Sequence, residues 1–378
     1  MAQPTSVAED QHSSEPEAPV FDFPLGWLLD HASPSIQARA CLEVAGINPA
    51  TEPGLSHLPY SDPQALRLAV TQSLDGTWHG SMLSIPAAGS HSFEGVGTIP
   101  AARRLMEYGW DKESPPLMLA RRILFRLLSE DNDPHYLFEF GGKGVTQTAA
   151  LRFRAILREA ASAALAHGGY EADPRLRGSG RRILERVDGF LVSPLAEKPW
   201  VRIGNRHVLA EEAAPPSIYA LTMLAYMPIF RSEHYPEMER LYAYLTQPKP
   251  TQESVQLYGK EIIAQNHLIL GDPLHNRNVV DSDVPFALLW LETMARFNFL
   301  KRNENWLKMF ERLVDDRDRK GIWHPRKGSD APASSSPFVW SSFPLGGDGE
   351  PDGNHQWTDV TFRLGLIAKQ LGWRIKLV

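Results

Sequence analysis

The sequence predicts an all-α fold, and three observations support this prediction. Apolar residues recur at the i, i+3, i+4 and i+7 spacing of one buried helix face, for example over 153–165 and 360–371. Ser-Pro and Asp-Pro pairs precede several such segments, where the first side chain can cap a helix and Pro can occupy its first turn. No run of alternating apolar and polar residues competes with these helical patterns.

Taken in order along the chain, the periodic segments give about twelve helices. Capping pairs at Ser33-Pro34, Asp62-Pro63, Ser114-Pro115 and Asp173-Pro174 mark four of the helix starts. One small hairpin is expected around the turn pair Gly204-Asn205, and a long loop rich in Ser, Pro and Gly is expected over 327–354. The expected helices span 34–45, 62–74, 98–108, 115–129, 148–167, 174–191, 216–228, 236–246, 253–268, 284–300, 304–315 and 357–371.

The composition is that of an ordinary folded chain, with 378 residues, 43% hydrophobic residues and 22% charged residues. A formal net charge of -6 provides no global basic field, so nucleic acid is not expected as a partner. The single cysteine, Cys41, excludes an intramolecular disulfide framework and every multi-cysteine zinc or iron–sulfur site.

The N-terminal stretch is polar and lacks the apolar core of a secretory signal, so residues 1–20 are expected to form a disordered tail. Residues 21–378 are expected to form a single domain. The longest apolar stretch, 218–230, is too short to span a bilayer. The sequence therefore predicts a cytoplasmic location without a spanning segment, and peripheral membrane contact stays open.

Two distant segments repeat the same short pattern, Leu74-Asp75-Gly76-Thr77-Trp78-His79 and Arg319-Lys320-Gly321-Ile322-Trp323-His324. In both, a glycine follows a helical stripe and is itself followed by one spacer and a Trp-His pair. Glycine lets the chain leave the helix with a positive φ, and the tryptophan can then cover the helix end. Asp75 and Asp318 are placed to accept hydrogen bonds from the turn.

This repeat, together with Gln72, resembles the helical-hairpin motif of the squalene-cyclase and prenyltransferase superfamily. The resemblance implies an α/α toroid of about six helical hairpins, which agrees with the expected number of helices. The protein-prenyltransferase branch needs a zinc ion held by Asp, Cys and His ligands. No Asp lies two residues before Cys41, so that branch is excluded, and neither a metal site nor a cofactor is expected.

The terpenoid-cyclase branch protonates an apolar substrate with the middle carboxyl of an Asp-x-Asp-Asp motif. Asp281-Ser282-Asp283-Val284 is similar to this motif and precedes an apolar helix that contains Trp290. The resemblance implies that Asp283 is the proton donor and that Asp281 assists it, although Val284 replaces the last Asp. Asp283 also stands where an N-cap residue would, which is the structural alternative for this side chain.

If the fold is a toroid, the starts of its inner helices face one central pocket. The sequence then predicts that Trp290, His355, Trp357 and Asp359 bind the substrate beside the two aspartates. The function expected from the resemblance is acid-initiated chemistry on an apolar, isoprenoid-type molecule inside a hydrophobic cavity.

Two alternatives remain open. One is a non-catalytic helical scaffold that binds a hydrophobic small molecule or a protein. The other is an α/α-barrel carbohydrate-active enzyme that stacks sugars on Trp and Tyr. A deep cavity that contains Asp283 would favour an enzyme, and a filled or shallow centre would favour the scaffold.

Overall fold

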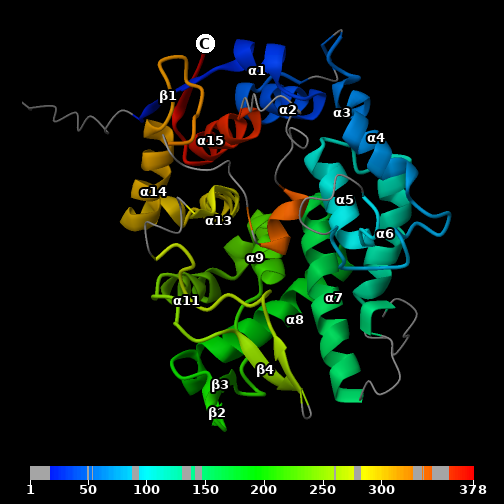
Figure 1. Cartoon of the computed structure of the whole chain (residues 1–378), viewed down its shortest axis with the longest axis vertical. Coiled ribbons are helices and arrows are strands. Elements are labelled where there is room, and N and C mark those ends of the chain that lie inside the picture. Colours follow the sequence, from blue (N-terminus) through cyan, green and yellow to red (C-terminus); the bar gives the residue numbers. More distant parts are fainter. Residues whose placement is uncertain are drawn as a thin grey trace, which may run out of the picture.

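The computed structural model is mainly helical (Figure 1). Two small sheets accompany the helices, so the expected all-α class holds for the main architecture but not for every segment. The structure describes residues 18–48, 51–52, 54–86, 93–129, 138–140, 147–258, 261–275, 282–326, 334, 336–342 and 357–378.

Most helices of the first half fall close to the expected ranges. The helices of this half are α1 (Leu25–His31), α2 (Pro34–Arg39) with its π-helical continuation (Ala40–Ala45), α3 (Leu58–Ser61), α4 (Pro63–Val70), α5 (Thr98–Glu107), α6 (Pro115–Leu127), α7 (Gln147–His167) and α8 (Pro174–Leu191). Helices α1 and α3 were not predicted, and α2 continues directly into its π-helical segment. Ser33, Asp62 and Asp173 cap their helices as predicted, each accepting a hydrogen bond from a first-turn backbone N–H. Ser114 precedes α6 without such a bond.

The second half continues with further helices at most of the expected places. They are α9 (Ile218–Ala225), α10 (Pro228–Glu233), α11 (Tyr235–Leu245), α13 (Val284–Arg296), α14 (Glu304–Asp315) and α15 (Thr358–Gln370). The helix expected over 284–300 is interrupted, because Asn298 takes a φ of 60° and a short 3₁₀ turn, Leu300–Arg302, follows.

The prediction of a helix over 253–268 is wrong. This segment forms β4 (Val255–Tyr258) and β5 (Glu261–Ala264), which pair in antiparallel fashion. The β-branched residues Val255, Ile262 and Ile263 favour strands, and an apolar run this short does not separate helix from strand by periodicity. The strands extend the predicted hairpin, which is present as β2 (Trp200–Ile203) and β3 (Arg206–Leu209).

A second sheet joins the two ends of the described chain. Strand β1 (Val20–Phe23) pairs in parallel with β6 (Arg374–Leu377), in the register Val20 with Arg374. The sequence did not predict either strand, since four residues are too few to establish a period of two.

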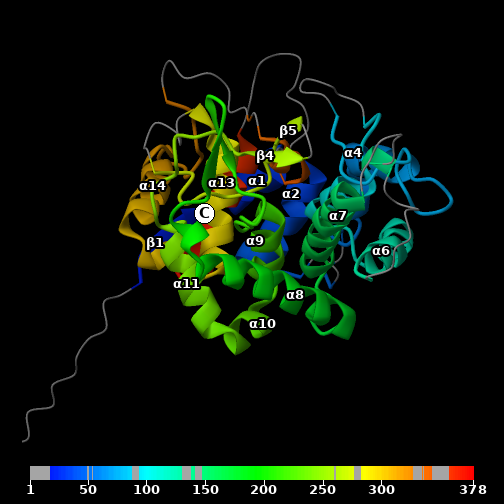
Figure 2. The ribbon, with the colours of Figure 1, turned by 90° about the horizontal axis from the view of Figure 1, so that it is seen from below.

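The helices differ in how much of their surface is buried. In α5, α9, α13 and α15 almost every residue is buried, and so is every residue from Glu159 to Ala166 of α7. In contrast, α4, α6, α8, α11 and α14 bury one face. In both views α6 and α14 lie on the outside, with α9 toward the middle (Figures 1 and 2).

The heavily buried helices contact one another in chain order. Helix α5 contacts α7, α7 contacts α9, α9 contacts α13, and α13 contacts α15, which returns to α2 and its π-helical continuation. Arg39 at the end of α2 reaches Glu107 at the end of α5 with a distance of 2.5 Å. These contacts link the inner helices in a closed succession.

The two repeat turns have the same geometry, as the sequence predicted. Gly76 and Gly321 have φ values of 88° and 81°, and Trp78 and Trp323 are both buried. The backbone N–H of each tryptophan donates to a threonine hydroxyl of an inner helix, Thr98 or Thr361, and both distances are 3.1 Å. The repeat thus fastens an outer helix to an inner one at two places.

The residue at the start of each repeat turn ties it to a further segment. Gln72 Nε2 donates to the carbonyl of Pro116 at the start of α6, at 2.9 Å. Arg317 holds the corresponding place in the second repeat and donates to the carbonyl of Asp22 in β1, also at 2.9 Å. Gln72 and Arg317 are therefore equivalent in position, but the sequence alone does not show this because their residue types differ.

Candidate functional site

Asp283, the expected proton donor, is the N-cap residue of α13. Its Oδ1 accepts a hydrogen bond from the N–H of Phe286 at 3.0 Å, and its Oδ2 accepts one from Ser334 Oγ at 2.9 Å. Both carboxylate oxygens therefore have donors. Asp281 lies outside the described residues.

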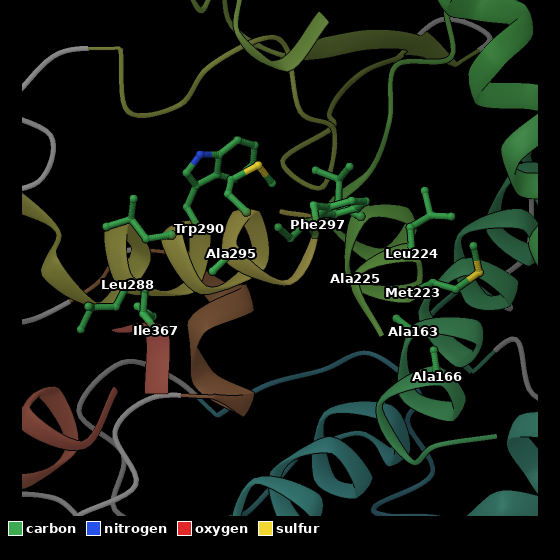
Figure 3. Close-up of a cluster of buried hydrophobic side chains, with 14 of the residues drawn as sticks. Ala163, Ala166, Met223, Leu224, Ala225, Leu288, Trp290, Ala295, Phe297 and Ile367 are labelled. Carbon is green, nitrogen blue, oxygen red and sulfur yellow. The ribbon is translucent and has the colours of Figure 1, made fainter. Parts of the chain in front are cut away.

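The expected substrate-binding residues are mostly packing residues. Trp290 is fully buried and meets Trp306 edge to face at 5.9 Å, within the cluster of apolar side chains from α7, α9, α13 and α15 (Figure 3). Trp357 meets Trp323 edge to face at 5.9 Å. Asp359 is buried at the start of α15, where its Oδ1 accepts a hydrogen bond from the N–H of Val360. His355 lies outside the described residues.

A cavity of about 290 Å³ lies elsewhere, beside α5, α7 and α9. Apolar side chains make most of its wall, and neither Asp283, Trp290, Trp357 nor Asp359 contributes to it. The lining consists of Leu83, Ile85, Ile99, Pro100, Arg103, Phe153, Ile156, Tyr219, Ile263, Ala264, Gln265, Asn266, His267, Pro337, Phe338 and Ser341.

Local structure explains how these side chains meet. Ile99 and Arg103 are one helical turn apart and so share a face of α5. The N–H of Ile218, the first residue of α9, donates to the carbonyl of His267 at 2.8 Å. That bond holds the segment after β5 against the start of α9 and places His267 next to Tyr219, with ring centroids 6.4 Å apart.

Burial keeps both of these rings uncharged near neutral pH. Burial raises the pKa of Tyr219 to about 12, and it lowers the pKa of His267 to about 4. Among the described lining residues, Arg103, which is 6% exposed, is the one that carries a charge near neutral pH. None of these described residues is acidic, so together they have a net positive charge.

A second, more polar cavity of about 220 Å³ adjoins the first and shares Ile156, Gln265 and His267 with it. Glu159, on its wall, is buried and accepts hydrogen bonds from Ser217 and from Arg186, the latter at 2.6 Å. Its charge is thus already matched. The other described charged side chains of the second cavity are also paired, Arg152 with Glu211 and Arg186 with Glu159. Arg103 in the first cavity has no such ion pair with a described residue.

Charged side chains from several inner helices meet in the core. Arg363 of α15 contacts Glu107 of α5 at 2.8 Å and Glu292 of α13 at 2.5 Å, and all three side chains are buried. His167 Nε2 lies 3.5 Å from Glu107. Burial opposes ionisation of Glu107, but the charges of Arg39 and Arg363 hold its pKa well below the usual range. This ion network therefore joins α5, α13 and α15 through charges that are buried and paired.

Both features have a signal in the sequence that no motif contains. Arg103, Glu107, Glu292 and Arg363 are charged residues inside segments in which most neighbours are apolar. A charge at such a position has to be paired or has to face a cavity. A sequence pattern that treats charged residues as solvated does not identify them.

The structure also bears on the single cysteine, on metal ligation and on membrane-spanning helices. Cys41 is buried, as expected for a small apolar residue, and burial raises the pKa of its thiol. Within the described ranges, no group of three His, Cys, Asp or Glu side chains is arranged to hold a metal ion. None of the described helices combines the length and the apolar character needed to cross a membrane.

The chain was compared with protein-family models, with curated proteins and with solved structures, and none of the three comparisons found a match.

Proposed function

We propose that this chain is a helical ligand-binding protein whose cavity beside α5, α7 and α9 takes a small, mainly apolar molecule. The observation that carries the proposal is the cavity of about 290 Å³ with its largely apolar wall. Ligand sites are typically concave and apolar with a few polar groups that orient the ligand. Here those groups are Arg103, Tyr219 and His267.

The architecture that we propose around this cavity is an α/α toroid of six hairpins. Heavily buried helices alternate along the chain with helices that bury one face, and the former contact each other in a closed succession. The matching repeat turns at Trp78 and Trp323 support the same arrangement and the resemblance to the cyclase superfamily.

Binding without acid-initiated chemistry fits the site better than the cyclase-like function does. Asp283 caps α13 and does not line the cavity. Among the cavity's described lining residues, none is a carboxylic acid that could protonate a substrate, and none is a tryptophan on which a sugar could stack. The inner helices α5, α13 and α15 meet at the ion network of Glu107, Glu292 and Arg363.

The test is binding of a neutral apolar probe, 4-phenylbutan-1-ol, measured by calorimetry on the full chain. Ile156→Trp fills the cavity and is expected to abolish binding. Ile229→Trp is the matched control, because Ile229 is exposed on α10 and lines neither cavity. Circular dichroism checks that both variants are folded. Equal binding by the two folded variants would contradict the proposal.

A further inference from the structure

Arg103 differs from the other buried arginines of the inner helices. Arg39 and Arg363 each contact a glutamate at 2.5 Å. Arg104 donates to the Tyr108 hydroxyl at 3.1 Å and to the carbonyl of Trp340. Arg103 is equally buried, at 6% exposed, but it has no hydrogen bond or ion pair with any residue that the structure describes. Its Nε is buried without an acceptor.

None of the described lining residues offsets this charge. No Asp or Glu is among them. His267 and Tyr219 are uncharged near neutral pH. The carboxylate of Glu139, on a neighbouring segment, already accepts from the N–H groups of Met82 and Leu83 at 2.7 and 2.6 Å. A buried charge without a partner is costly, so the site favours an occupant that brings an anion.

The number of charges in the wall limits which anion fits. Arg103 is the only Lys or Arg among the lining residues that the structure describes, so these residues provide one permanent positive charge. A carboxylate carries one negative charge and matches the planar guanidinium with two parallel hydrogen bonds. A phosphate monoester carries closer to two charges near neutral pH, and the described lining has no second cation to match it.

We propose that the cavity binds a small monocarboxylic acid with an apolar body, and that Arg103 pairs with its carboxylate. The inference rests on the proposed function and names the class of ligand. The side chains of Ile99, Phe153 and Phe338 contact the body of the ligand, and the Tyr219 hydroxyl is a second donor beside the carboxylate. An engineered cavity of about 150 Å³ binds benzene, so roughly twelve non-hydrogen atoms suit this one.

The experiment compares 4-phenylbutyrate with its neutral amide, 4-phenylbutanamide, by calorimetry on the full chain. The two probes have the same size and shape, so only the charge distinguishes them. The acid is expected to bind about tenfold or more tightly than the amide, since hydrogen bonds between charged groups are stronger than neutral ones. Arg103→Met is expected to remove this preference and leave the amide affinity unchanged, whereas Arg67→Met on the exposed surface of α4 retains it.

Each other outcome has a definite meaning. If acid and amide bind equally to the natural chain, the inference fails and the proposed function stands. If neither binds, both fail. If inorganic phosphate displaces the acid at equal concentration, the site belongs to a phosphate group and the inference is overturned. The comparison of the two probes on the natural chain needs no variant, so it holds even if Arg103→Met does not fold.

Discussion

Arg363 shows how a single side chain can be held by several elements at once. Its guanidinium is 2% exposed and bonds to Glu107 of α5, Glu292 of α13 and the carbonyl of Ser342. Its Nε still lacks a partner among the described residues. Arg363 therefore holds three separate segments together through one guanidinium group. Its removal would leave the carboxylates of Glu107 and Glu292 buried.

We expect Arg363→Met to lower the free energy of unfolding by about 3–5 kcal/mol, because Glu107 and Glu292, two buried carboxylates, each lose one of the guanidinium groups that match their charge. Arg326→Met is the matched control: Arg326 is exposed and pairs only with Asp316, at 3.0 Å. It should change the free energy of unfolding by less than about 1 kcal/mol. Urea denaturation measures both values, and equally small losses would contradict the structural role of the network.

At the scale of the element, β1 packs closely on α15 at Gly365. Among the described glycines, Gly365 has the shortest distance from an added Cβ to a side chain. A Cβ added to Gly365 of α15 would lie 2.4 Å from the ring of Phe23. Phe23 is fully buried, so its ring has little room to move. Close packing of the strand on the helix thus depends on the absence of a side chain at Gly365.

Gly365→Ala should lower the free energy of unfolding by about 1–3 kcal/mol through overpacking. The control is Gly189→Ala in α8, where the added Cβ meets nothing within 4 Å. There alanine should raise the free energy of unfolding by about 0.5–1 kcal/mol, because it restricts the unfolded chain. Thermal denaturation of both variants shows the sign, and a shared sign would be inconsistent with this packing.

The helices also show how much the sequence predicts. Helices such as α8 and α14 were predictable because each buries one face, which leaves a period of 3.6 in the sequence. Strands β4 and β5 were not, because their identity depends on pairing with β3 and with each other. The cavity could not be predicted from the sequence for a related reason. Its wall combines Arg103, Tyr219 and His267, which come from three separate segments.

At the scale of the whole molecule, stability depends on histidines that are buried uncharged. Burial lowers the pKa of His167 from 6.5 to about 3 and that of His267 from 6.5 to about 4. Between those values and 6.5 the unfolded chain binds protons that the folded chain does not. The free energy of unfolding therefore falls as the pH falls below 6.5.

His167→Gln should make this fall shallower between pH 6 and 5, by up to about 1.4 kcal/mol per pH unit. Over most of that range the unfolded-state carboxyl of Glu107 is ionised, because the ordinary pKa of a glutamate is about 4.3. His207→Gln, at an exposed position of β3, is the control and should leave the slope unchanged. Urea denaturation across the pH range gives the slopes, and identical slopes in the natural chain and His167→Gln would refute this account.

The parallel pair of β1 and β6 has a consequence for synthesis. Among the described elements, β1 is the first to leave the ribosome and β6 is the last. Until β6 emerges, the backbone of β1 has no strand to pair with. Arg317 is made before β6 and can already donate a hydrogen bond to the carbonyl of Asp22 in β1. The helices between them can pair with their neighbours during translation, but the succession of inner helices can close only after translation has passed α15.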